Sequence, residues 1–104
     1  TTYKAELKRE LVDHLKTAPE IQKIVIFGSF LSSDNPNDLD VAILQNSVEP
    51  YLDLALKYRK MSRSVARKIA IDFIPLKANC DDSRFLKAIN SGEVIYEKGN
   101  SKLA

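Results

Sequence analysis

The chain has few of the residues that form the disulfides and zinc sites of many small proteins. Its 104 residues include one cysteine, one histidine and no tryptophan. Cys80 has no second cysteine with which to form an internal disulfide, and His14 has no second histidine for a zinc pair. We therefore exclude a disulfide framework and a cysteine-based zinc cluster, and we expect a reducing compartment.

Long apolar segments are also missing. No apolar run approaches the roughly 20 residues that span a bilayer, and the amino-terminal TTYKAELKRE lacks the apolar core of a signal peptide. We expect a cytoplasmic protein with no membrane segment.

The formal charge of +2 is too small to indicate a nucleic-acid binder by itself. With 44% hydrophobic and 29% charged residues, we expect residues 1–104 to fold as a single domain.

Apolar residues at a spacing of three or four predict three helices. The first begins at residue 3 and ends near Pro19. The second begins at Pro50 and extends to about residue 69, which would make it the longest helix. A short third helix is expected between residues 81 and 92, capped by an aspartate and ended by a glycine.

Four apolar or alternating segments predict β-strands, at residues 24–27, 38–44, 70–76 and 93–96. Pro75 indicates a sheet edge or the end of a strand. The segment 32–37, SSDNPN, is rich in turn-forming residues and is expected to be a loop. Strands and helices in this order predict an α+β fold with a small mixed sheet flanked by helices.

Two aspartates lie on one face of the strand predicted at residues 38–44. The alternation places Asp38 and Asp40 on the face opposite Leu39, Val41 and Ile43. Same-face residues are about 7 Å apart, so these carboxylates repel each other unless a cation or a proton intervenes. Magnesium prefers such hard oxygen ligands and often shares them with substrate phosphates. The pattern therefore predicts a magnesium site.

A third acid and a Gly-Ser pair extend this pattern. Asp72 lies within the apolar strand predicted at residues 70–76, so we expect a buried acid there. Its position in the alternation allows its carboxylate to converge with those of Asp38 and Asp40. Three carboxylates could hold two cations about 3.5–4 Å apart, a separation suited to phosphoryl displacement. Gly28 would let the backbone approach a phosphate, and Ser29 adds a hydroxyl donor.

In this order, G28-S29, D38-L39-D40 and D72, the chain resembles the nucleotidyltransferase superfamily that includes DNA polymerase beta. It is especially similar to the minimal nucleotidyltransferases, and the similarity covers roughly residues 4 to 97. The resemblance implies the polymerase beta palm-like fold. It also implies that Gly28 and Ser29 hold a nucleoside triphosphate, that Asp38 and Asp40 bind two Mg²⁺ ions, and that Asp72 binds the catalytic metal and helps activate the acceptor hydroxyl.

The resemblance further implies a biological setting. Small relatives pair with helical HEPN-domain proteins as antitoxins, and some transfer AMP from ATP to the toxin. A HEPN-type toxin is therefore the expected partner, with a homo-oligomer as the alternative. Many relatives follow Gly-Ser with an alanine-arginine-glycine stretch, whereas this chain reads FLSSD. That departure leaves open a non-catalytic interaction module that neutralises or scaffolds a partner.

Lysines and arginines are frequent in the helix predicted at residues 50–69. Their spacing spreads them around the helix axis, and no aromatic platform for stacking bases is evident nearby. We interpret them as a solvated helix face and expect no specific nucleic-acid binding, while an acidic partner or a phosphate stays open. They are Lys57, Arg59, Lys60, Arg63, Arg67 and Lys68.

Overall fold

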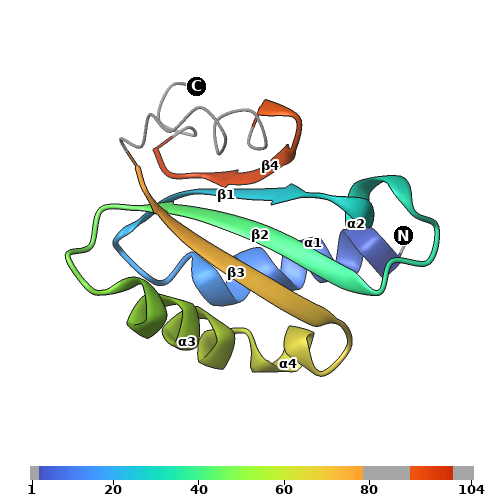
Figure 1. Cartoon of the computed structure of the whole chain (residues 1–104), viewed down its shortest axis with the longest axis horizontal. Coiled ribbons are helices and arrows are strands. Elements are labelled where there is room, and N and C mark those ends of the chain that lie inside the picture. Colours follow the sequence, from blue (N-terminus) through green and yellow to red (C-terminus); the bar gives the residue numbers. More distant parts are fainter. Residues whose placement is uncertain (1–2, 79–89, 100–104) are drawn as a thin grey trace.

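The fold is a four-stranded sheet with helices packed on it (Figure 1). The computed structural model describes residues 3–78 and 90–99. The elements in chain order are α1 (Tyr3–Leu15), β1 (Ile21–Phe27), α2 (Ser29–Ser32), β2 (Asp38–Gln45), α3 (Tyr51–Met61), α4 (Arg63–Ala66), β3 (Ala70–Lys77) and β4 (Glu93–Glu97).

The sheet is mixed, as the sequence predicts, with the strand order β3-β2-β1-β4. Strand β1 pairs antiparallel with β2 and with β4, whereas β2 and β3 are parallel over their full eight-residue length. Strands β3 and β4 form the two edges, and α3 and α4 run beside β3 (Figure 1). Because β3 is an edge strand, it tolerates Pro75 and continues beyond it to Lys77.

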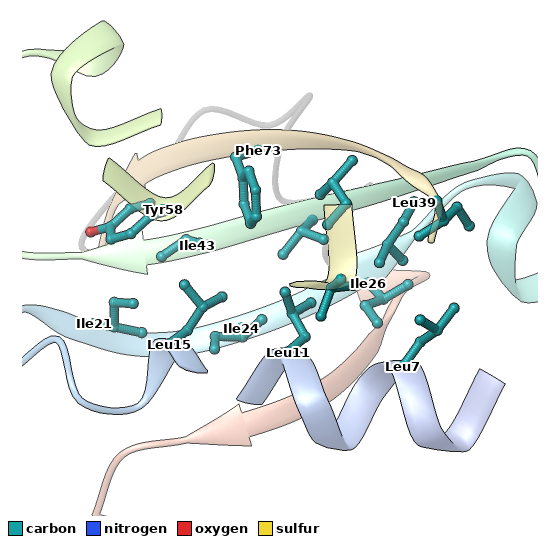
Figure 2. Packing of buried hydrophobic residues seen from close by; sticks show 14 of the residues in the cluster. Leu7, Leu11, Leu15, Ile21, Ile24, Ile26, Leu39, Ile43, Tyr58 and Phe73 are labelled. Carbon is teal, nitrogen blue, oxygen red and sulfur yellow. The ribbon is translucent and has the colours of Figure 1, made fainter. Parts of the chain in front are cut away.

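The core lies between the sheet and a layer formed by α1, α3 and α4. The predicted four-residue spacing in α1 is confirmed, since Leu7, Leu11 and Leu15 are buried and point toward the sheet (Figure 2). Tyr58 is the largest fully buried side chain. The strands contribute core residues to the same buried cluster as the helices: Ile21, Ile24, Ile26, Leu39, Val41, Ile43, Ile71 and Phe73.

The prediction of one long helix at residues 50–69 is wrong. The helix ends at Met61 and a new turn, α4, begins at Arg63, so α1 is the longest helix among the described residues. Between them Ser62 leaves helical geometry, with φ −106° and ψ 28°. Its side chain is fully buried, and Val65 in the following turn belongs to the core. Serine also has a weaker helix preference than alanine or leucine.

Two further expectations concern the remaining segments. The strand predicted at residues 93–96 is observed as β4, one residue longer. The short helix expected between residues 81 and 92 falls mainly on residues 79–89, outside the described ones. Within the part of the chain that the structure describes, no helix combines the length and apolar character needed to cross a membrane.

Candidate active site

Strand register brings the three aspartates together. Asp40 on β2 pairs with Asp72 on β3, and Asp38 pairs with Ala70. Residues paired across neighbouring strands lie about 5 Å apart and share a face. Since Leu39 and Ile71 face the helices, the three carboxylates occupy the opposite face of the sheet. The face predicted for each acid is therefore the face observed.

The same three aspartates line a pocket of about 380 Å³. Its other lining residues are Arg59, Ala70 and Ile71. The expectation that Asp72 is a buried acid is wrong, because its side chain is exposed. Among the described residues, β3 is an edge strand with no neighbour on its far side. An exposed carboxylate at a pocket wall is accessible to a substrate.

The pocket concentrates negative charge. Burial raises the pKa of the Asp40 carboxyl, and the negative charges of Asp72 and Asp38 raise that pKa further. The ionised form of Asp40 is therefore destabilised in the metal-free protein. Among the described residues, no three Asp, Glu, His or Cys side chains lie close enough together to hold a metal ion by themselves. A metal ion bound at this pocket would need further oxygen ligands from water or from a substrate.

Gly28 lies directly against this cluster. Its backbone angles, φ 81° and ψ −158°, fall in a region open essentially only to glycine. A Cβ atom at this position would lie 2.5 Å from Oδ2 of Asp40. Gly28 and Asp40 are thus in close contact. Ser29 follows as the exposed first residue of α2, and neither Gly28 nor Ser29 lines the pocket itself.

Arg59 is the pocket residue that the sequence interpretation missed. It was assigned to a solvated helix face, but its side chain extends from α3 to the edge of β3. There its Nη2 donates a hydrogen bond to the backbone oxygen of Ile71, at 3.1 Å. The guanidinium therefore lies beside the three carboxylates. No local pattern separates Arg59 from the neighbouring basic residues, because its role depends on how α3 packs against β3.

Comparisons with known proteins identify the family of the chain. A family model described as polymerase beta, nucleotidyltransferase, matches residues 9–101. A comparison with curated proteins found no match.

Solved structures show the same fold at low sequence identity. One contains a tri-AMPylated Shewanella oneidensis HEPN toxin in complex with an MNT antitoxin, with 17% identity and a TM-score of 0.63 over 96% of this chain and 77% of that chain. A toxin–antitoxin crystal structure with AMP-PNP has 18% identity and a TM-score of 0.63, covering 92% and 77%. The toxin–antitoxin MntA-HepT has 16% identity and a TM-score of 0.60, covering 95% and 77%.

Proposed function

Because the chain belongs to the polymerase beta nucleotidyltransferase family, we propose that it transfers AMP from ATP to a hydroxyl group of a partner protein. The partner is a HEPN-domain toxin, which the transfer neutralises. The observation that carries this proposal is the convergence of Asp38, Asp40 and Asp72 on one pocket. Two neighbours in fold support the donor and the acceptor, since one contains AMP-PNP and another a tri-AMPylated HEPN toxin.

The donor set fits magnesium in two respects. Carboxylate oxygens are hard ligands of the kind that Mg²⁺ prefers. Burial and the charges of Asp72 and Asp38 raise the pKa of Asp40, so a cation beside it would favour its ionised form. We assign Asp38, Asp40 and Asp72 as ligands of two Mg²⁺ ions, with triphosphate oxygens and water completing the coordination. When bound, these ions would neutralise charge on the phosphates and on the leaving group.

The remaining roles follow from the positions of the residues. Gly28 allows the backbone to approach the triphosphate, and the Ser29 hydroxyl donates a hydrogen bond to it. The acceptor oxygen forms a bond to the α-phosphorus while the bond from that phosphorus to the bridging oxygen breaks, and pyrophosphate leaves. The acceptor proton passes to the carboxylate of Asp72, which is exposed and therefore reachable by a protein substrate.

The cellular setting completes the proposal. We place the reaction in the cytoplasm, where the single cysteine would stay reduced and ATP is available. We also treat residues 1–104 as one catalytic domain that contributes all three carboxylates. No nucleic-acid template takes part, so specificity comes from the protein acceptor.

The test is a labelling experiment with α-labelled ATP, Mg²⁺ and the purified HEPN-domain partner. The wild type should label the partner. Asp38→Asn and Asp40→Asn should each reduce labelling by at least about 100-fold, a loss comparable to removing one strong catalytic interaction. Asp34→Asn, the same chemical change in the exposed loop before β2, should label normally. Absence of label under all metal conditions, with partner binding intact, would instead support the non-catalytic interaction module.

A further inference from the structure

Another hollow lies along α3 and α4 and shares Arg59 with the aspartate pocket. This α3–α4 groove has a volume of about 320 Å³ and contains no acidic lining residue. Its lining is formed by four cations and two apolar side chains. They are Leu56, Arg59, Lys60, Arg63, Ala66 and Arg67.

The basic residues of this region have two different roles, which the sequence did not separate. Lys57 donates to Glu20 at 2.9 Å, and Lys68 donates to Glu10 at 2.8 Å. These two lysines therefore help to hold the fold together. Neither of them lines the groove.

Three of the four groove cations are not used in this way. Within residues 3–78 and 90–99, no ion pair involves Lys60, Arg63 or Arg67. The break at Ser62 turns α4 relative to α3, and the three side chains gather around one groove together with Arg59. Like charges this close raise the local positive potential, which favours an anionic ligand.

The groove also has an apolar component. Leu56 has 56% of its surface exposed, and Leu52, one helical turn earlier, has 71% exposed. A single exposed leucine is ordinary. Two exposed leucines on one helix face beside a cationic groove could contact the apolar side chains of a bound segment, while the cations pair with its acidic side chains. Bases of a nucleic acid suit it less, since the groove has no aromatic lining residue.

The groove lies at the end of the active site that is farther from Gly28. Phe27 pairs with Asp40, and Asp40 pairs with Asp72, so Gly28, Asp40 and Asp72 follow one another across the sheet. Arg59 comes next, at the edge of β3, and it lines both the pocket and the groove. With the nucleotide held on the Gly28 side, an acceptor held in the groove would reach Asp72 from the β3 edge.

From this we infer that the α3–α4 groove is the docking surface for an acidic, amphipathic segment of the acceptor protein. The acidic side chains pair with Arg63, Arg67 and Lys60, and apolar side chains cover Leu56. The acceptor hydroxyl then reaches Asp72 past Arg59. This inference rests on the proposed function, because it assigns the acceptor side of that same reaction.

The experiment compares two double variants of equal charge change. Arg63→Glu with Arg67→Glu alters the groove, whereas Arg9→Glu with Lys16→Glu alters two exposed cations outside it, on α1 and just after it. Affinity for the purified HEPN-domain partner is measured by calorimetry. The groove variant should bind the partner at least about tenfold more weakly, and the control should bind as the wild type does. Affinity for AMP-PNP with Mg²⁺ should stay within about twofold in both.

Steady-state labelling adds a second measurement. The groove variant should raise the KM for the partner and leave the KM for ATP unchanged. If the glutamates unfold the protein, Arg63→Gln with Arg67→Gln provides a milder test with the same expected direction. Wild-type partner affinity in a folded groove variant would overturn the inference. Groove-dependent binding of a single-stranded RNA that displaces the partner would also overturn the inference. Partner binding that depends on the groove but gives no labelling would support the docking surface and refute only the transfer.

Discussion

Replacing Asp40 by asparagine should make the metal-free protein more stable, the reverse of what most substitutions of a partly buried residue do. Burial and the charges of Asp72 and Asp38 raise the pKa of Asp40 above its ordinary value of 3.8. A raised carboxyl pKa means that the folded protein binds this proton more tightly than the unfolded chain does. Ionised Asp40 therefore costs stability at neutral pH, and that cost disappears as the pH falls below about 3.8.

The size of the effect follows from the strand geometry. Asp40 is about 5 Å from its cross-strand neighbour Asp72 and about 7 Å from Asp38 on the same strand. In a solvent-exposed pocket, with screening at physiological salt, these two repulsions amount to about 0.5–1 kcal/mol. Asp40→Asn should raise the free energy of unfolding by that amount, which corresponds to about 2–8 °C in Tm for a domain of this size.

Magnesium should stabilise the wild type more than the variant. At about ten times its Kd, the ion would stabilise the wild type by about 1.4 kcal/mol, and the variant by less, because the variant lacks one ligand. Thermal or urea unfolding with EDTA and with Mg²⁺ measures both parts. Asp34→Asn, which makes the same change in net charge from the exposed loop, should show neither effect. A variant that is no more stable than the wild type in EDTA would refute the proposed repulsion, and equal magnesium stabilisation would remove Asp40 from the metal site.

Three other changes test the surrounding structure. Gly28→Ala should lower the free energy of unfolding by about 1–3 kcal/mol and reduce AMP transfer, because alanine is strained at this backbone geometry and its Cβ would displace the Asp40 carboxylate. Tyr58→Phe should cost about 1–2 kcal/mol without changing the KM for ATP, because it removes a 2.8 Å hydrogen bond to the Glu20 carboxylate. Burial alone would raise the pKa of Glu20, but hydrogen bonds from Lys57 and Tyr58 outweigh it and lower that pKa below 4.5. This contribution to stability is complete above about pH 4.5 and is lost as the pH falls through the lowered pKa, so Glu20→Gln should flatten the acid limb of the stability profile.

Each of these has a clear opposing result. Normal stability and transfer in Gly28→Ala would show that the turn can move away from Asp40. A large loss of activity in Tyr58→Phe would give the buried tyrosine a role beyond folding. An unchanged acid limb in Glu20→Gln would mean that other carboxylates dominate unfolding at low pH.

Local patterns in the chain were enough to place most of the secondary structure and the face of each acid. The spacing of Leu7, Leu11 and Leu15 predicted α1, since residues four apart share one side of a helix. Alternation predicted that Asp40 lies on the strand face opposite Leu39 and that Asp72 lies opposite Ile71, since neighbouring strand residues point to opposite faces. The family inferred from the order of these motifs is confirmed by the family model.

Relations between distant segments came only with the tertiary structure. Strand pairing decided that Asp40 stands opposite Asp72, and that β3 is an edge where Asp72 is exposed. Packing around the buried Ser62 ended α3 early, and the docking of α3 beside β3 brought Arg59 to the pocket. Periodicity describes one segment at a time, whereas register and packing arise from the free energy of burying several segments together.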